Sequence, residues 1–543
     1  MPSQDPKVRA RNFEEVALIP GTDMFFKLAP TTSSFASFIQ ELTVKPRPVA
    51  PVGIGINYYE EVTNKVIGED IQYGFSLRGT SGGGQNAPFW FTNNKYGLGP
   101  IDRHTVQARA YISRAAEVDS LRAWRIGYGA DMAAGYGNES EFCVQQLYLD
   151  VQWQMLRLSI GQKQRASELK NEELSTGGMT LGVNARPLPQ LRLELPEFWA
   201  IPGTKEWFAV KAHIAYGIYT DNRWQRNWNA GTKNFYTQNS LYHSKALLMR
   251  IGNEKRFPLS LTFGLEMACQ FGGKGYNQIG YRGEQFEGEV KLGGNILNAF
   301  FPSGGDVNDD SFTNAAGNHV GSWHARLDWK GKGWNVGAYM DHLFEDHSQL
   351  AMQYGFWKDM LLGLEVNLPE NRYVSTLVYE HIGTMNQSGP IYHDATVENP
   401  LQISASDSYY NNHVYGSWQH GGFVMGNPLI PSPMYNSYLG MPGSLNNFHN
   451  RINAHHIGIK GNPTPYLSWR TLYTYEKNLG SYDRPVKDPL KGHFLLVEAT
   501  YKPKKLRGLG FSAAYGLNHG SLLGNANAAM LTVSFDGWIR KYN

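Results

Sequence analysis

VQARAYISR (residues 106–114) alternates apolar and polar side chains with a period of two, so every second residue falls on the same face of an extended chain. The pattern returns in segments of about ten residues from Ile71 to Ile539, between clusters of Gly, Asn, Asp or Pro. It is repeated in LRLSIGQKQ (156–164), HARLDWKG (324–331), RYVSTLVYE (372–380), LSWRTLYTYEK (467–477) and MLTVSFDGW (530–538). A tilted strand needs about this length to cross a bilayer. The sequence therefore predicts an all-β fold, a transmembrane antiparallel β-barrel.

The composition agrees with a barrel and excludes a helical membrane protein. Aromatic residues make up 13% of the chain, yet its mean hydropathy is only -0.42, and no stretch approaches the roughly eighteen apolar residues of a helical span. A barrel hides its apolar content from such an average because only alternate residues face lipid, while Tyr and Trp gather at the two interfaces. A large soluble all-β protein, such as a propeller or a pair of sandwiches, is the alternative with the same alternation.

The connections between these segments predict the topology. Eight are tight and polar: SRAAEVDS (113–120), WQ (153–154), RPLPQ (186–190), GNEKRF (252–257), KGKG (330–333), NLPENR (367–372), GNPTP (461–465) and KPKKLRG (502–508). They alternate with nine longer ones, near 81–102, 134–140, 164–176, up to 240, 271–316, 346–356, 385–448, 478–491 and 519–526. Outer-membrane barrels have short periplasmic turns and long extracellular loops, so we expect about 18 strands with both barrel ends in the periplasm.

One segment conflicts with this count. Between RPLPQ and residue 241 there are two strand-like runs, LRLEL (191–195) and WFAVKAHIAYGIY (207–219), where the alternation of short and long connections allows one. We expect the second run to be the barrel strand, because it is longer and alternates better.

The chain divides into a barrel over residues 71–543 and an N-terminal segment over residues 1–70. The latter is rich in Pro, Thr and Ser and shows little alternation, so we interpret it as a periplasmic segment that is ordered only in part. The opening MPSQDPKVRARNFEE carries charges where a secretory signal has its apolar core. We nevertheless predict the bacterial outer membrane as the location, because the pattern of strands requires it.

Several chemical functions find no support in the sequence. Cys143 and Cys269 lie in strand-like runs, which leaves a disulfide open but favours two buried or lipid-facing thiols. His455 and His456 are adjacent on a strand and point to opposite faces, so they cannot share a metal as neighbours. Asp306 begins a run with calcium-loop spacing that lacks the required Gly and the bidentate Glu. With no nucleophile elbow or zinc motif either, we expect no enzyme, metal or cofactor, and a net charge of +3 gives no reason to expect nucleic acid.

Several quoted segments together resemble the capsule assembly Wzi family, and in particular its Bacteroidetes-type branch. They are NAPFWFTNNKYGLG (86–99), LYLDVQWQMLRLSIGQKQ (147–164), GGMTLGVNARPLPQLRLELPE (177–197), YYNNHVYGSWQHGGFVMGNPLIPSPMYN (409–436) and NRINAHHIGIKG (450–461). The resemblance covers the chain from about Ile71 onward. It implies an eighteen-stranded outer-membrane barrel of a Gram-negative cell that acts as a lectin-like attachment factor for capsular polysaccharide, without catalysis.

The outer loops carry the side chains that bind polysaccharide. Aromatic faces stack on sugar rings, and amides and Arg hydrogen-bond hydroxyls or pair with uronates. The segment DNRWQRNWNAGTKNFY (221–236) is the densest basic and aromatic cluster in the chain. Our candidate carbohydrate-binding residues are Arg223, Trp224, Arg226, Trp228 and Tyr236 from this loop, with Tyr415 and Trp418 from the loop over 385–448. The alternative reading places Trp224 and Trp228 in the interface belt or a loop core.

The loop over 385–448 has two open interpretations. Its length and its aromatic residues favour a folded loop in or over the barrel mouth, which is either a plug of the lumen or a platform for a ligand. We expect the chemistry of the protein in the loops at 219–239, 271–316 and 385–448. The expected partners are capsular or other surface polysaccharide, outer-membrane lipid and lipopolysaccharide. A porin-like channel and a subunit of a larger envelope export or assembly complex, with protein partners, are the competing functions.

Overall fold

The computed structural model describes residues 70–119, 123–137, 141–279, 285–289, 299–300, 317–345, 350, 352, 355, 357–369, 371, 373–389, 397–398 and 407–539, together with the backbone of three short strands near the N-terminus. These three, β1 (Val16–Leu18), β2 (Met24–Lys27) and β3 (Lys45–Pro46), pair in a small antiparallel sheet. The rest of residues 1–69, which we expect to form a periplasmic segment, lies outside the described residues.

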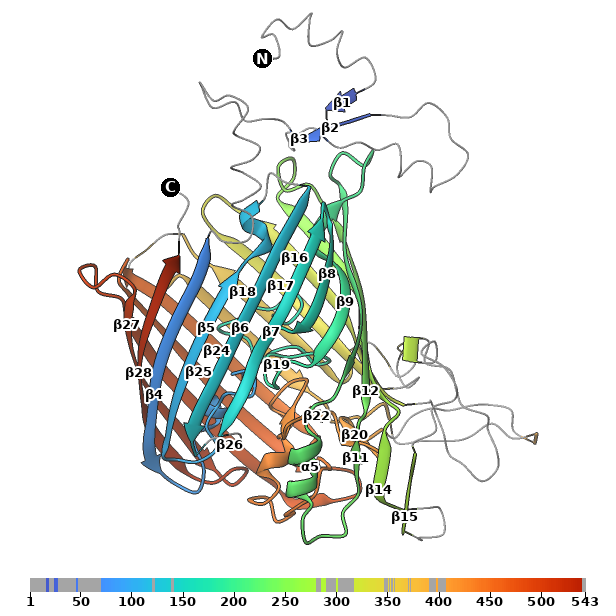
Figure 1. Cartoon of the computed structure of the whole chain (residues 1–543). Coiled ribbons are helices and arrows are strands. Elements are labelled where there is room, and N and C mark those ends of the chain that lie inside the picture. The colour runs from blue at the N-terminus through green and yellow to red at the C-terminus, as the bar shows by residue number, and fades with distance from the viewer. Residues whose placement is uncertain are drawn as a thin grey trace, which may run out of the picture.

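Eighteen antiparallel strands close into one barrel (Figure 1). They are β4 (Ile71–Gly83), β5 (Thr105–Arg114), β6 (Trp124–Tyr136), β7 (Phe142–Trp153), β8 (Leu156–Gln162), β9 (Pro189–Ala200), β10 (Phe208–Ile218), β12 (Leu241–Ile251), β13 (Leu259–Phe271), β16 (Asn318–Lys330), β17 (Asn335–Glu345), β18 (Met360–Asn367), β19 (Thr376–Gly383), β24 (Ile452–Thr464), β25 (Leu467–Gly480), β26 (Pro485–Tyr501), β27 (Leu509–Gly520) and β28 (Ala526–Ile539). The last strand closes on the first, with Ile539 opposite Ile71 and Asn527 opposite Gly83. The predicted fold class and strand number are confirmed.

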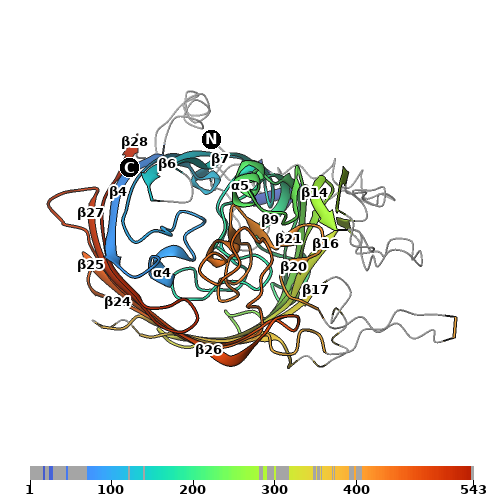
Figure 2. The same ribbon diagram turned by 90° about the horizontal axis from the view of Figure 1, so that it is seen from below.

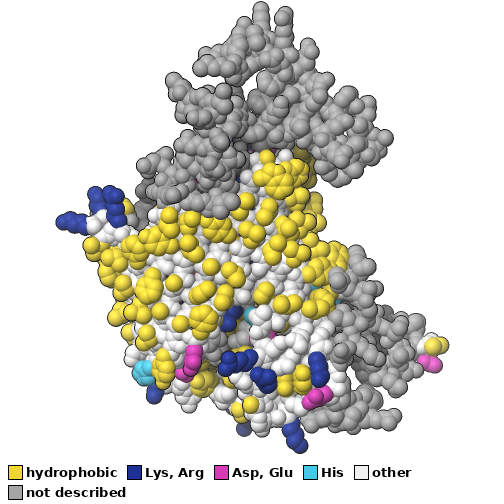
Figure 3. Space-filling model, viewed as in Figure 1, with side chains coloured by type: hydrophobic (Ala, Val, Ile, Leu, Met, Phe, Trp, Pro, Cys, Tyr) yellow, Lys and Arg dark blue, Asp and Glu magenta, His cyan; other side chains and the backbone are white. Residues whose placement is uncertain are grey.

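The barrel wall is apolar outside and polar inside, the reverse of a soluble protein. On β8, Leu158 and Ile160 are 37% and 47% exposed, whereas Arg157 and Ser159 between them are buried in the interior. Figure 3 shows the apolar side chains spread over the outer wall, while most of the Lys and Arg side chains on this face gather toward the end that carries the long loops. This wall suits a bilayer and excludes the soluble alternative. None of the helices in the described residues is long and apolar enough to cross a membrane.

Short turns lie at one end of the barrel and long connections at the other (Figure 1). Seven predicted tight turns are confirmed, for example residues 154–155 between β7 and β8, and 465–466 between β24 and β25. The barrel begins at Ile71 and ends at Ile539, both at the short-turn end. We refer below to the two ends as the short-turn end and the loop end.

The prediction around RPLPQ is wrong. Residues 186–188 end the long connection between β8 and β9, and both strand-like runs are barrel strands, joined by a short turn over residues 201–207. Pro189 is the first residue of β9, where a missing N–H costs no ladder hydrogen bond, so a Pro-rich stretch marked the start of a strand and not a turn. The outer connection predicted at 164–176 therefore runs over 163–188, and the strand number is unchanged.

Small elements outside the barrel sheet lie in the connections. At the loop end, β11 (Tyr236–Gln238), β14 (Lys274–Ile279) and β15 (Gln285–Glu289) form a separate sheet, and β20 (Asn411–Asn412) to β23 (Phe423–Val424) form two short hairpins with β21 (Gly416–Ser417) and β22 (Gln419–His420). In the described part of the chain, the helices are α4 (Phe89–Thr92), α5 (Asn222–Trp228) and the single turns η1 (Ala116–Asp119) and η2 (Pro433–Tyr435). Most of the predicted loop over 271–316, including the calcium-like run at Asp306, lies outside the described residues.

Candidate carbohydrate-binding surface

Three connections fold into the barrel and pack together; we call them the lumen loops. They are residues 84–104, 163–188 and 407–451, and Figure 2 shows the first, with α4, and the third within the ring of strands. Trp90, Leu174 and Phe423, one from each loop, belong to a single buried apolar cluster that also includes inward side chains of the wall such as Val320. The lumen of this barrel thus contains a core like that of a globular domain.

Buried polar groups fasten the lumen loops to the wall and to one another. The Glu380 carboxylate on β19 accepts hydrogen bonds from the Ser175 hydroxyl (2.6 Å), the Thr176 amide (2.7 Å) and the Tyr339 hydroxyl (2.7 Å). Asn427 in turn donates to the Thr176 hydroxyl (2.9 Å). A buried carboxylate that accepts this many bonds is well satisfied, and losing it would leave several buried donors unpaired. These loops are therefore part of the fixed structure.

Two of the predicted sugar-binding residues lie inside this core. Trp418 is completely buried, donates from Nε1 to the Thr180 carbonyl (2.9 Å) and stacks on Tyr242 at 6.5 Å. Tyr415 is 3% exposed and its hydroxyl donates to the Gly272 carbonyl at 3.2 Å. Protein covers both aromatic faces, so these residues position the loop and offer no surface to a ligand from solvent.

The remaining predicted residues lie on the loop end. Trp224 and Trp228 are one turn apart on α5, and their rings stack at 5.4 Å with an interplanar angle of 17°; we call this pair the Trp platform. Both rings are half-buried, and the neighbouring Arg223 and Arg226 are exposed. Flat aromatic faces beside guanidinium groups can stack on a sugar ring and bind its hydroxyls or carboxylates.

The Trp platform is seated on the third lumen loop. Trp228 donates from Nε1 to the Ser444 carbonyl (3.1 Å), and the Trp224 ring covers Gly422, where a Cβ would lie only 2.6 Å from the ring. The Asp221 carboxylate before α5 accepts bonds from Gln419 Nε2 and the Gly421 amide, both at 3.0 Å. These contacts hold the platform rigidly at its base, which lowers the loss of conformational entropy that binding would have to offset.

Tyr236 forms a second aromatic pair beside α5. Its ring stacks on that of Tyr276 at 5.0 Å and 10°, and the Lys274 ammonium lies 4.9 Å from the Tyr276 ring. Tyr236 belongs to the small sheet of β11, β14 and β15, so part of its face is used within the protein. The structure thus brings five predicted residues to the loop end, and it separates them from Tyr415 and Trp418.

A depression at the loop end was not foreseen in the sequence. It has a volume of about 660 Å³, lies between residues 84–104 and residues 437–438, and is lined by Gly84, Gln85, Asp102, Arg103, His104, Tyr136, Ser437 and Tyr438. Tyr136 is 78% exposed. An aromatic ring among amide, carboxylate and guanidinium groups is chemistry that suits a carbohydrate. Only the contact between connections more than 300 residues apart creates it, so local composition gave no signal.

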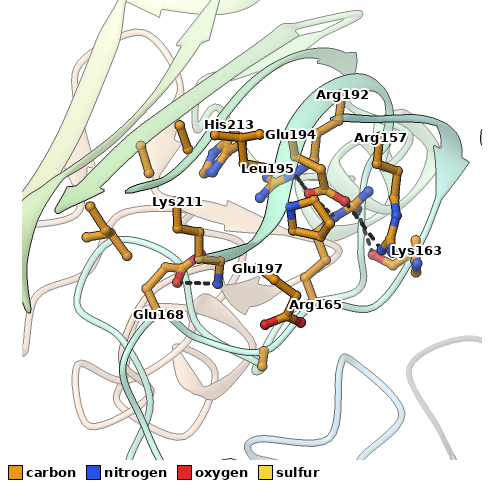
Figure 4. Close-up of a pocket in the computed structure, with 15 residues that line it drawn as sticks. Arg157, Lys163, Arg165, Glu168, Arg192, Glu194, Leu195, Glu197, Lys211 and His213 are labelled. Atoms are coloured by element: carbon orange, nitrogen blue, oxygen red, sulfur yellow. Dashed lines mark hydrogen bonds and ion pairs between the residues drawn. The ribbon is translucent and has the colours of Figure 1, made fainter. Parts of the chain in front are cut away.

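A cavity of about 190 Å³ on the inner wall has many charged residues (Figure 4). Arg192 pairs with Glu194 at 2.5 Å and Lys211 pairs with Glu168 at 2.7 Å, while Lys163 pairs with Asp150 just outside the lining. The charges largely compensate one another, as expected for a polar barrel interior. We assign this cavity no ligand.

Two smaller observations bear on chemistry. In the described part of the chain, no three His, Cys, Asp or Glu side chains are grouped to hold a metal ion, and Cys143 and Cys269 are separate buried thiols, so they form no disulfide.

In the third lumen loop, burial lowers the pKa of His420 below its usual value, although the Asp221 carboxylate opposes this. The neutral ring donates from Nδ1 to the Arg186 carbonyl (2.9 Å), which leaves Nε2 to accept from the Thr220 hydroxyl (3.0 Å).

Comparisons with known proteins agree with the fold. No family model matches the sequence, and no curated protein matches it. Among solved structures, the chain is similar to Wzi, an outer-membrane protein involved in group 1 capsule assembly in Escherichia coli and a carbohydrate-binding β-barrel. The TM-score is 0.51 at 12% identity, over 92% of this chain and 91% of that one. It also matches OprD and OpdK from Pseudomonas aeruginosa, with TM-scores of 0.41 and 0.42, identities of 11% and 13%, and coverage of 88% and 87% of this chain and 98% and 99% of theirs.

At 12% identity, the likeness to the Escherichia coli protein shows the fold. The chain is an outer-membrane β-barrel that is Wzi-like in architecture, and its apolar outer wall agrees with that location. Membership of the Wzi family and of its Bacteroidetes branch stays a prediction from the sequence.

Proposed function

We propose that this barrel is a non-catalytic attachment factor that binds a surface polysaccharide, capsular polysaccharide above all, at its loop end. The observation that carries the proposal is the Trp platform with the exposed Arg223 and Arg226 beside it. Stacked indole rings offer a flat apolar surface, and the two guanidinium groups add charge for uronate-containing polymers. The fixed position of the platform on the third lumen loop supports a binding role, because a preformed site loses less conformational entropy when a ligand binds.

The lumen loops support attachment over transport. A porin-like channel needs a water-filled path, whereas here Trp90, Leu174 and Phe423 from three connections meet in an apolar core within the barrel. The similar Escherichia coli protein binds carbohydrate, which agrees with the proposal without deciding it for this chain.

Binding of purified capsular polysaccharides to immobilised protein tests the proposal. We expect the Trp224→Ala, Trp228→Ala double variant to bind about 30-fold more weakly, since a stacked aromatic contributes on the order of 1 kcal/mol per ring. The matched control is Trp124→Ala with Trp153→Ala, a second tryptophan pair (6.3 Å) at the short-turn end, which should bind like the wild type. No binding of any acidic or neutral polysaccharide by the wild type would refute the proposal.

Charge and transport are tested separately. The Arg223→Gln, Arg226→Gln variant should lose affinity for acidic polymers only, and raised salt should mimic it. Large stable openings of the wild type in a planar bilayer would favour the channel, and stoichiometric co-purification of other envelope proteins would favour a subunit of an export or assembly complex.

A further inference from the structure

A group of four polar side chains lies on the outer face of β25 and β26, toward the loop end. Lys477 is directly opposite Lys491 in the ladder, and two residues along each strand Tyr475 is opposite His493. Their chain neighbours Glu476 and Asn478 are buried on the inner side, so these four side chains face away from the lumen. We call this group the Lys–His patch.

The two lysines form no ion pair with the residues that the structure describes. Other described lysines, such as Lys163 and Lys460, do pair with a carboxylate. Like charges directly opposite each other on a sheet face are destabilising. An anion from outside the protein would remove that cost.

The patch marks the boundary of the apolar wall. The Tyr473 hydroxyl lies 2.9 Å from Nδ1 of His493, and His519 continues the row on the next strand, 6.1 Å from His493. Toward the short-turn end, Val497 and Tyr473 are 44% and 39% exposed on the outer wall. A polar row that ends an apolar surface is typical of the depth at which lipid headgroups lie.

The His493 ring can donate a hydrogen bond to an anion. If the Tyr473 hydroxyl donates to Nδ1, the neutral imidazole carries its proton on Nε2. The side chains of Lys491 and His493 are on the same face of β26, two residues apart, and Lys477 is across the ladder from Lys491. Two ammonium groups and an N–H on one side of the wall suit a phosphate group.

We propose that the Lys–His patch binds a phosphate of the phosphorylated glucosamine glycolipid (lipid A) of the outer leaflet, with the acyl chains along Tyr473 and Val497. The patch faces sideways from the wall and adjoins its apolar surface, so a ligand that combines an anionic headgroup with hydrocarbon fits it better than a polysaccharide in solution. The site is separate from the Trp platform and does not depend on the proposed function.

Native mass spectrometry of the full chain in detergent, titrated with diphosphoryl lipid A, tests the proposal. We expect the Lys477→Gln, Lys491→Gln variant to bind at least tenfold more weakly, since each basic side chain near an anionic lipid surface contributes appreciably to binding. The matched control is Lys504→Gln with Lys505→Gln, which makes the same change of charge in the exposed turn 502–508 at the short-turn end. This variant should bind like the wild type.

Two further arms identify the ligand. Lipid A without its phosphates should bind the wild type as weakly as diphosphoryl lipid A binds the double variant, and excess inorganic phosphate should displace little lipid. Retention of heat-modifiable migration shows that each variant is folded. Equal binding of diphosphoryl lipid A by the wild type and the Lys477→Gln, Lys491→Gln variant would overturn the proposal, and so would equal binding of the dephosphorylated lipid or binding of inorganic phosphate alone with similar affinity.

Discussion

Replacing Trp418 by Ala should release the third lumen loop while leaving the barrel intact. The indole is completely buried, stacks on Tyr242 and donates to the Thr180 carbonyl, which belongs to the second lumen loop. Truncating a buried Trp to Ala costs about 3–5 kcal/mol. A cost of about 4 kcal/mol raises the open population of the loop by roughly a factor of 10³.

Hydrogen exchange of the Met425 amide measures this opening directly. In the folded loop that amide donates to the Trp418 carbonyl at 2.9 Å, so it exchanges only when the hairpin around it opens. We expect its exchange to rise by about three orders of magnitude in Trp418→Ala, while the amides of the barrel strands stay protected. Conductance in a planar bilayer should rise in the same variant if the loop obstructs the lumen.

The control is Trp228→Ala on α5, which contacts the edge of the third lumen loop. Its ring is half-buried, and its Nε1 donates to the Ser444 carbonyl, so protection of the Met425 amide should change by no more than a few-fold. Exchange at Met425 in Trp418→Ala that stays within about threefold of the wild type would refute the reasoning, because packing of the indole would then not hold the loop.

Other predictions test the remaining contacts. Because the pKa of His420 is lowered in the folded loop, its contribution to loop stability is complete above about pH 6.5 and is lost as the pH falls below that value. The protection of the loop amides, measured relative to their intrinsic exchange rates at each pH, should therefore decrease from pH 7 to pH 5, and less so in His420→Gln. Glu380→Ala should lower the midpoint of thermal unfolding by leaving buried donors unpaired, with a cost of about 3 kcal/mol, and Glu380→Gln should be milder. Lys255→Gln, which breaks an exposed ion pair at 3.0 Å, should change stability by less than about 1 kcal/mol. Cys143 and Cys269 should resist a water-soluble alkylating reagent in the folded protein, and a fast reaction of either thiol would contradict its burial.

The strands could be predicted because each must satisfy lipid on one face and the interior on the other. That constraint acts on every second residue, so it is visible in a local window such as residues 106–114. Once the strands are located, the alternating short and long connections between them predict the topology. The error at RPLPQ arose where two physical requirements share one composition. A Pro-rich polar stretch suits a tight turn. It equally suits the first residue of a strand, which is the position of Pro189 in β9.

For the long loop over residues 385–448, the sequence predicted that it folds but not which residues it contacts. The aromatic content of residues 409–436 favoured a folded loop, and the structure shows residues 407–451 packed against the inner wall as a plug would be. Which residues it would touch could not be read, because contacts such as Trp418 with Thr180 join positions 238 residues apart in the sequence. The depression at the loop end that Tyr136 lines also depends on contacts between residues far apart in the sequence.

The two candidate clusters, Trp224 with Trp228 and Tyr415 with Trp418, show why composition cannot separate a binding surface from a core. Both pairs combine aromatic rings with polar neighbours in an outer loop. The difference is that α5 presents two rings one turn apart on a helix seated at the loop end, whereas Trp418 lies in a connection that turns into the lumen. An aromatic ring in a barrel loop contributes to binding only if the loop that carries it remains outside the lumen. For this chain that condition favours the Trp platform. Loss of Trp418 should loosen the third lumen loop on which the platform is seated, although Trp418 itself contacts no ligand.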